Sequence, residues 1–304
     1  MALFPLPTSS SSSVYLLPLH LPSLHCISLV NNLSLSLSLS LSLMAVSKQI
    51  ARTAVGILGN IISIILFLSP VPTFIQICKK GSVEQFSAAP YLATLINCSL
   101  WVLYGLPMVH PNSTLVLTIN GAGVVIELVY LLLFLRYSDR RKKLRVVVIM
   151  LIECVILAAL AILVMTLAHT TKVRSTTVGS IALVGNVLMY ASPLAVMKMV
   201  ITTRSVEYMP LSLSLASLAN GICWTTYAVI RFDPFIAVPN GLGIVFGLAQ
   251  LILYATFYRS TKKQALERQV KWEMGLAATT ISGLDSAKTS RVAQNGHDSY
   301  VNGT

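Results

Sequence analysis

LSPVPTFIQICKKGSVE, at residues 68–84, has a second version, ASPLAVMKMVITTRSVE, at residues 191–207. Ser69-Pro70 matches Ser192-Pro193, and Ser82-Val83-Glu84 matches Ser205-Val206-Glu207, in both cases 123 positions further along the chain. Matches at one fixed spacing indicate two copies of one structural unit.

The match continues beyond these segments. At the same spacing, the residue pairs that match are Asn97 and Asn220, Trp101 and Trp224, and Tyr104 and Tyr227. NGAG at residues 120–123 matches NGLG at residues 240–243 at a spacing of 120, because a loop in the second copy is three residues shorter. The duplication therefore carries polar and aromatic residues with it in register.

The composition assigns the chain to the membrane proteins. Of its 304 residues, 55% are hydrophobic and only 11% are charged, whereas soluble domains carry about 25% charged residues. Seven apolar segments approach the roughly 20 residues that a helix needs to cross a bilayer. These predicted spans are Ala54–Ile77, Ala89–Leu106, Thr114–Leu135, Val146–Ala168, Val178–Val200, Pro210–Ile230 and Ile236–Tyr258.

The spans and the duplication together predict an all-α membrane protein of seven transmembrane helices in a three-one-three arrangement. The two repeats cover residues 54–137 and 178–258, and the span at residues 146–168 links them. Because each repeat has three helices, an odd number, two repeats joined directly would have opposite orientations in the membrane. The additional linker helix between them restores a parallel orientation. Parallel repeats around an axis along the membrane normal are typical of transporters, whose sites lie between the repeats near the bilayer midplane.

The basic residues orient these spans. One side of the membrane would hold 17 of the 22 Lys and Arg residues, and the other side five. Because positive charge favours the cytosolic side, we expect an extracellular N-terminus and a cytosolic C-terminus. The net charge of +12 thus indicates topology and attraction to anionic membrane lipid rather than nucleic-acid binding. The polar tail at residues 259–304 is predicted to be disordered.

Residues 1–43 form a low-complexity N-terminal extension with three open interpretations. The Leu-Ser alternation before Met44 is what a translated CT-repeat leader would encode, with Met44 as the natural start. The segment is alternatively a disordered extension. A signal peptide is the third interpretation, although no Lys or Arg precedes Lys48 to form its basic region.

The five cysteines form no CxxC motif, so we expect neither a disulfide framework nor a metal site. We interpret them as apolar side chains that contribute only to packing.

The three-one-three arrangement, with LSPVPTF, INGAGVVIE, YASPL, RSVEYMP and VPNGLG in these places, resembles the SWEET family of sugar transporters. The resemblance covers roughly residues 53–258. It implies facilitated, bidirectional movement of sugars across the plasma membrane without a cofactor. Homo- or hetero-oligomers are compatible with it, because two three-helix units alone would provide only a thin wall around a substrate path.

The duplicated residues suit a sugar on chemical grounds. A sugar offers neutral hydroxyl groups and apolar C–H faces, which an Asn amide and a Trp ring can match. We therefore expect Asn120, Asn240, Trp101 and Trp224 to bind substrate. The alternative is that the Asn residues only join helices and the Trp residues lie in an interfacial belt.

The resemblance adds detail to this site. It implies that Asn120, Asn240 and Trp224 line the sugar site, and that Trp101 stands where some members have a small residue. Disaccharide carriers of the family have small residues where this chain has Asn97, Asn220 and Met189. The larger side chains predict a monosaccharide such as glucose or fructose rather than sucrose.

Two further groups resemble the family's gates. Pro70 and Pro193 should kink their helices, while Pro90 and Pro210 fit the first position of a helix. The resemblance makes all four an inner gate. It also implies an outer gate formed by Tyr104, Tyr227 and Asp233, for which an aromatic belt is the alternative.

Three other functional classes have features that the sequence can be compared with. A seven-helix receptor would not repeat as three plus three helices. A proton-coupled transporter needs a relay of acids in the membrane, and only Glu127 and Glu153 lie within spans. An enzyme is disfavoured, because the sequence has no HExxH or GxSxG motif.

Overall fold

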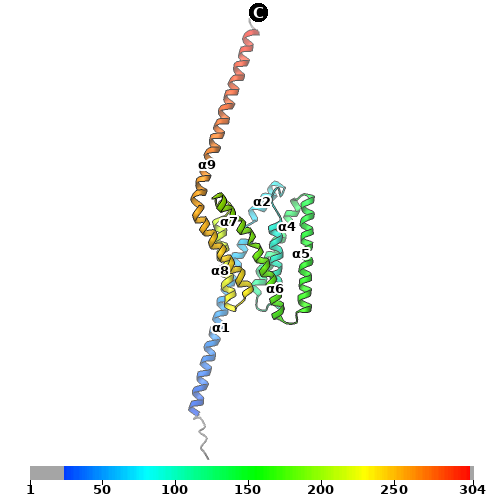
Figure 1. Ribbon diagram of the computed structural model, residues 1–304, viewed down its shortest axis with the longest axis vertical. Helices are drawn as coiled ribbons and strands as arrows, with labels where there is room; N and C mark the ends of the chain where they lie inside the picture. Colours follow the sequence, from blue (N-terminus) through cyan, green and yellow to red (C-terminus); the bar gives the residue numbers. More distant parts are fainter. Residues whose placement is uncertain (1–23, 302–304) are drawn as a thin grey trace, which may run out of the picture. The chain divides into compact units, whose positions relative to one another are not determined.

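The computed structural model describes residues 24–301 and is all-helical over that range (Figure 1). The helices of this range are α1 (Leu24–Phe67), α2 (Val71–Lys80), α3 (Ala89–Gly105), α4 (Thr114–Tyr137), α5 (Arg140–Leu167), α6 (Thr171–Met189), α7 (Ala191–Thr203), α8 (Leu211–Arg231) and α9 (Pro234–Val301). The all-α membrane fold predicted from the sequence is confirmed.

The chain divides into two compact units, residues 1–51 and residues 52–304. In the first unit, residues 24–51 form the beginning of α1. The Leu-Ser run lacks Gly and Pro, and Ser hydroxyls donate to carbonyls one turn back, Ser40 to Leu37 and Ser42 to Ser38, each at 2.9 Å. Residues 1–23 of the predicted extension lie outside the described residues.

Among the described residues, six segments are long and apolar enough to cross a membrane: Ser34–Lys80, Thr114–Tyr137, Arg140–Leu167, Thr171–Thr203, Leu211–Arg231 and Pro234–Met274. They correspond to six of the seven predicted spans. The remaining span is α3, which has 17 residues. At 1.5 Å per residue it is about 26 Å long, slightly shorter than a hydrocarbon core of about 30 Å.

Two of the predicted spans are broken, and the breaks match between the repeats. The first span is divided between α1 and α2 around Pro70, and the fifth is divided between α6 and α7 at Tyr190, three residues before Pro193. A proline has no N–H to donate and its ring clashes with the preceding turn, so a helix is readily interrupted beside it. Pro90 is in the first turn of α3, and Pro210 precedes the first residue of α8.

The packing of the second unit follows the duplication. α3 packs on α4, and α2 also contacts α4, just as α8 packs on α9 and α7 contacts α9. The two repeats meet where α3 of the first contacts α6 of the second, and α6 also contacts α9 of its own repeat. The linker helix α5 buries only Val146 and Val164 of its 28 residues, which fits a helix at the edge of the bundle rather than a wall of its interior.

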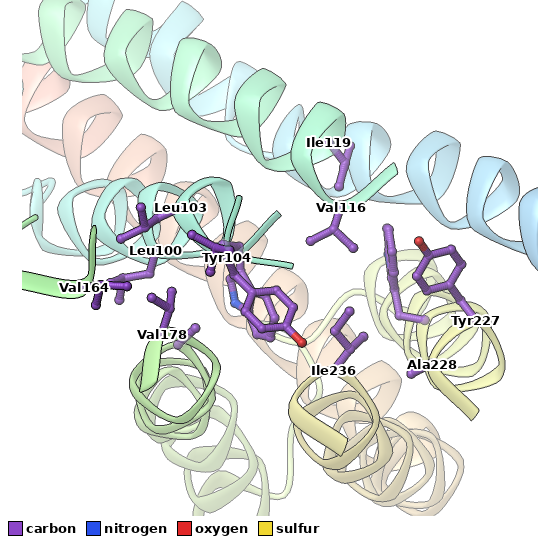
Figure 2. Packing of buried hydrophobic residues seen from close by; sticks show 14 residues of the cluster. Leu100, Leu103, Tyr104, Val116, Ile119, Val164, Val178, Tyr227, Ala228 and Ile236 are labelled. Atoms are coloured by element: carbon purple, nitrogen blue, oxygen red, sulfur yellow. The ribbon is translucent and has the colours of Figure 1, made fainter. Parts of the chain in front are cut away.

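The largest hydrophobic core joins both repeats (Figure 2). It contains Trp101 and Tyr104 from α3 and Trp224 and Tyr227 from α8, together with aliphatic side chains from α4, α5, α6 and α9. Tyr104 is fully buried and Tyr227 is 1% exposed. Burial of so much aromatic surface fixes the helices around the interior of the bundle.

The last helix, α9, continues through most of the polar tail to Val301. The chain has no proline after Pro239. Side chains one turn apart also support the helix: Lys263 lies 3.9 Å from Glu267, and Gln269 donates to Glu273 at 3.0 Å.

Replacing Gly105 with Ala should destabilise the bundle. A β-carbon there would lie 3.0 Å from the backbone nitrogen and 3.1 Å from the α-carbon of Leu117 in α4, which cannot move aside as a side chain can. Overpacking of this kind costs about 1–3 kcal/mol, so we expect the unfolding temperature in detergent to fall by roughly 2–10 °C. Gly121→Ala is the control, because a β-carbon at Gly121 meets nothing within 4 Å. Equal unfolding temperatures for the two variants would contradict the close packing of α3 on α4.

Candidate functional site

A cavity of about 300 Å³ lies between the two repeats. Its walls come from α1, α3 and α4 of the first repeat and from α6, α7, α8 and α9 of the second. The predicted site residues that line it are Asn97, Trp101, Asn120, Pro193, Asn220, Trp224 and Asn240. None of the described residues that line this cavity is charged, so the cavity suits a neutral ligand.

Asn120 and Asn240 occupy the cavity wall in matching ways. Each amide nitrogen donates to the carbonyl one turn back in its own helix, Asn120 to Val116 at 2.9 Å and Asn240 to Ile236 at 2.8 Å. This bond orients the side chain and uses one of its two N–H groups. The amide oxygen and the second N–H of each residue remain available for a ligand.

A second cluster of polar side chains lies between α1 and α8. The hydroxyl of Ser63 donates to the amide oxygen of Asn220 at 2.7 Å and accepts from the indole nitrogen of Trp224 at 3.2 Å. These bonds hold both α8 side chains against α1. In the first repeat the matching Asn97 has a buried amide oxygen with no hydrogen-bond partner among the described residues. A buried acceptor without a partner costs about 1–3 kcal/mol, so a polar ligand in the cavity would relieve this cost.

The two tryptophans are buried in the wall with matching geometry. Trp101 meets Tyr104 edge-to-face at 5.4 Å and 83°, and Trp224 meets Tyr227 at 5.2 Å and 70°. The rings are 5% and 6% exposed. They offer flat apolar surface to a ligand between the repeats.

The glycines of the NGxG segments permit a close approach in both repeats. A β-carbon at Gly123 would lie 2.8 Å from the ring of Phe67, and one at Gly243 would lie 2.8 Å from the hydroxyl of Tyr190. Phe67 and Tyr190 both line the cavity. Tyr190 also donates to the carbonyl of Pro239 at 2.5 Å, which ties the break between α6 and α7 to α9.

Four residues predicted for the substrate site or the inner gate do not line this cavity. Met189 is half-buried outside it, because the chain directs the next residue, Tyr190, into the wall. Pro70, Pro90 and Pro210 lie at helix starts away from it. The cavity size therefore depends on Asn97 and Asn220 and not on Met189.

Sequence reasoning missed several lining residues, which include Ser63, Phe67, Asn186, Tyr190, Ser217, Phe246 and Gln250. The spacing of 123 could have revealed four of them. Ser63 matches Asn186, and Phe67 matches Tyr190, at that spacing.

Near the ends of α3 and α8, Tyr104 and Asp233 form a buried contact. The Tyr104 hydroxyl lies 3.0 and 2.9 Å from the two carboxylate oxygens of Asp233. Asp233 also accepts from the backbone nitrogens of Phe235 and Ile236 at 3.1 and 3.3 Å. The carboxylate therefore caps α9 and joins it to α3 at the same time.

His110, which sequence reasoning missed, completes this contact. Its ring stacks on Tyr104 at 4.6 Å, its Nε2 lies 3.4 Å from Asp233, and its Nδ1 lies 2.6 Å from the hydroxyl of Ser175. Burial lowers the pKa of His110, and the nearby Asp233 opposes that shift. His110 and Asp233 are 123 residues apart, so matching positions of the two repeats meet here.

Tyr227, the third predicted residue of this group, has a different neighbour. The guanidinium of Arg52 lies 3.9 Å above its ring and donates to the carbonyl of Asn112 at 3.1 Å. The structure thus brings Tyr104 and Asp233 together, while Tyr227 stacks beneath a cation.

Comparison with known proteins places this geometry in a family. Residues 53–142 and 176–262 match the model of a family described as "Sugar efflux transporter for intercellular exchange". The two matched stretches begin and end close to the two repeats found in the sequence.

Two relatives are similar over most of the chain. A bidirectional sugar transporter of Oryza sativa subsp. indica, SWEET4, is 58% identical over 243 residues, which is 80% of this chain and 93% of the relative. A bidirectional sugar transporter of Arabidopsis thaliana, SWEET7, is 53% identical over 247 residues, which is 81% of this chain and 96% of the relative.

A solved structure agrees with these matches. The structure of a eukaryotic SWEET transporter superimposes with a TM-score of 0.68 at 38% identity, covering 70% of this chain and 99% of that one. These relatives are transporters by name, which confirms the prediction that the chain is not an enzyme and excludes the receptor alternative. Duplicated sequence, paired three-helix units and an uncharged cavity between them thus agree with every comparison, and the chain belongs to the SWEET family of sugar transporters.

Proposed function

We propose that this protein carries a monosaccharide such as glucose or fructose in both directions, down its concentration gradient. The observation that supports this most is the pair of amides, Asn120 and Asn240, held in the same way on opposite repeats of one uncharged cavity. Two amides facing one space can bind hydroxyl groups on both edges of one ring.

The size of the cavity supports a small sugar. About 300 Å³ is the lower end of the roughly 300–1,000 Å³ that ligand pockets occupy. Asn97 and Asn220 reduce this volume from α3 and α8. Trp101 and Trp224 serve as walls against the C–H faces of the ring.

The carrier should bind its sugar weakly. A sugar that must leave on either side cannot be held in a deep energy well, and a dissociation constant of about 1 mM corresponds to only about 4 kcal/mol. A few hydrogen bonds to Asn and one stacked ring supply a free energy of this size.

Movement between two states would use the breaks and contacts described above. The matching breaks beside Pro70 and Pro193, and the helix starts at Pro90 and Pro210, provide hinges at one end of the bundle. The contact between Tyr104 and Asp233, with Tyr227 nearby, closes the other end. Alternating access would then follow from rocking one repeat against the other.

The expected setting is the plasma membrane, with the end at Asp233 facing outward and the tail of α9 in the cytosol. The excess of Lys and Arg at the opposite end of the spans supports this orientation.

The test is transport by the full-length protein in liposomes. Labelled glucose and fructose should equilibrate in both directions without a pH gradient, and each should enter at least tenfold faster than labelled sucrose. Sucrose uptake equal to hexose uptake would overturn the monosaccharide proposal. Uptake that needs a pH gradient would instead favour a proton-coupled carrier, in which the buried Glu127, whose Oε2 has no partner among the described residues, would be the first group to replace.

A further inference from the structure

A second cavity, which shares no lining residue with the substrate cavity, lies beside the linker helix. It has a volume of about 820 Å³ and is bounded by residues 84–89, α3, the end of α4 and the start of α5. Its lining residues are Glu84, Gln85, Phe86, Ser87, Ala88, Ala89, Leu92, Phe134, Lys142, Arg145, Val146 and Ile149. We call it the linker groove.

The interior of the linker groove is apolar. Leu92, Phe134 and Val146 are buried in its floor, and Ile149 is half-buried beside them. On the adjoining surface of α5, Ile152 is 52% exposed. An apolar groove that continues into an apolar exposed helix surface suits a hydrocarbon chain of the bilayer.

The rim of the linker groove is basic. Six of the ten residues from 136 to 145 are Lys or Arg, and Asp139 is the only acid among them. Lys142 and Arg145 line the groove. The Lys142 ammonium donates to the carbonyl of Glu84 at 2.6 Å and lies 3.9 Å from the carboxylate of Asp139. The exposed Arg145 forms no hydrogen bond or ion pair within the described part of the chain.

The carboxylate of Glu84 does not cancel this charge. It pairs with the Lys80 ammonium at 3.0 Å, so the charges of Glu84 and Lys80 balance each other. The hydroxyl of Ser87 accepts from the backbone nitrogen of Ala89 at 3.2 Å and leaves its own hydrogen free to donate. The groove thus offers a guanidinium, an ammonium and a hydroxyl around one opening.

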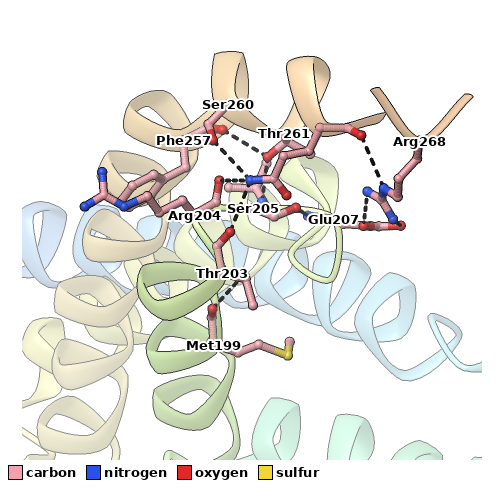
Figure 3. A network of polar contacts seen from close by, with 11 residues as sticks. Met199, Thr203, Arg204, Ser205, Glu207, Phe257, Ser260, Thr261 and Arg268 are labelled. Carbon is pink, nitrogen blue, oxygen red and sulfur yellow. Dashed lines mark hydrogen bonds and ion pairs between the residues drawn. The ribbon is translucent and has the colours of Figure 1, made fainter. Parts of the chain in front are cut away.

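The matching loop of the second repeat is covered instead (Figure 3). Arg268 of α9 binds the carboxylate of Glu207 at 2.7 and 3.2 Å, and the hydroxyl of Thr261 accepts from the nitrogen of Val206 at 2.8 Å. Gln264 donates to the carbonyl of Thr203 at 3.2 Å. Because α9 covers that loop, the surroundings of the two matching loops differ, and the linker groove is a feature of the first repeat.

We infer that the linker groove binds an anionic phospholipid of the leaflet on its side of the membrane, which the charge distribution predicts to be cytosolic. Arg145 and Lys142 hold the phosphate, and an acyl chain lies along Leu92, Phe134 and Ile149. Guanidinium and phosphate match in charge and geometry, and basic pockets between membrane helices on the cytosolic side are suited to anionic headgroups. This inference does not depend on which sugar is carried.

The test measures lipid retention by the purified full-length protein. Native mass spectrometry after titration with phosphatidylserine or phosphatidylcholine should show selective retention of phosphatidylserine. Arg145→Gln should lower its apparent affinity at least fivefold. Lys143→Gln removes one charge from the same linker but lies outside the groove, so it should change the affinity less than twofold.

A second pair of variants adds charge rather than removing it. Ser87→Asp keeps an acceptor for Ala89 but places a carboxylate in the groove, and it should also lower the affinity at least fivefold. Ser82→Asp adds the same charge at a Ser that accepts from Glu84 in the same way outside the groove, and should leave the affinity within twofold. If Ser87→Asp does not fold, the Arg145→Gln comparison decides.

Three results would overturn the inference. Equal effects of Arg145→Gln and Lys143→Gln would mean that only diffuse charge attracts the lipid. Equal retention of phosphatidylcholine would remove the role of the headgroup. Displacement of the lipid by an equal concentration of soluble glycerophosphoserine would identify a free phosphate ester, not a membrane lipid, as the ligand.

Discussion

Replacing Asn120 or Asn240 with Leu should reduce labelled glucose uptake at least fivefold, and the double variant should carry no measurable flux. Each amide uses one N–H for its own helix and has an oxygen and a second N–H left for substrate. Losing one hydrogen-bond partner in a buried site costs about 1–3 kcal/mol, or roughly 5- to 150-fold. Leu has the same branching and the same number of side-chain heavy atoms as Asn but lacks its polar groups. Initial uptake rates, divided by the amount of protein at the cell surface, measure the effect.

Asn60→Leu is the matched control. Asn60 lies in α1, donates to the hydroxyl of Thr118 at 3.3 Å and does not line the cavity. Its replacement makes the same chemical change in the same repeat, so uptake should stay within about threefold of the unchanged protein, given the loss of one modest bond. If Asn60→Leu lowered uptake as much as Asn120→Leu, the loss would reflect helix packing, and the assignment of the paired amides to substrate would fail.

The second large effect is expected at the contact between Tyr104 and Asp233. Tyr104→Phe removes a buried bond to a carboxylate, and such bonds contribute about 1.5–3 kcal/mol. The state that is open on the Asp233 side should therefore become roughly 10- to 150-fold more populated relative to the closed state. The ring and its stacking on His110 are kept, so the fold should be preserved.

This shift can be followed by chemical labelling. Ser217 lines the cavity, and Ser217→Cys would react with a membrane-impermeant thiol reagent applied from the Asp233 side only while that end is open. Tyr104→Phe should raise the labelling rate of the introduced cysteine at least tenfold. The background rate, measured in the same protein with Ser217 unchanged, is subtracted first. Tyr227→Phe keeps its ring beneath Arg52 and should raise the rate far less. Equal rates in the two variants would show that the contact with Asp233 does not hold this end closed.

Much of the site could be predicted because its residues occur in both sequence repeats. A single Asn in an apolar helix is compatible with helix packing, but Asn120 and Asn240 recur within the same short segment. The same holds for Trp101 and Trp224. Their common wall follows from the parallel arrangement of the repeats, since residues that match in sequence then face one axis.

The remainder depends on contacts that have no pattern along the chain. Arg52 lies just before the first predicted span, and only folding brings its guanidinium over Tyr227. His110 stands in a loop without neighbours that suggest a role, and its partner Asp233 belongs to the other repeat. Met189 was expected at the site from the family resemblance alone. The helix break that directs Tyr190 inward instead can be located from Pro193 only to within a few residues.

The central claim is that one neutral sugar is held between the two repeats by the paired amides. An experimental structure of the full-length protein, determined at a glucose concentration that saturates transport, tests it most directly. The account predicts density for one sugar ring within hydrogen-bonding distance of both Asn120 and Asn240 and against the face of Trp224, and no such density in the Asn120→Leu, Asn240→Leu double variant. A sugar bound elsewhere, or retained in the same place by the double variant, would contradict it.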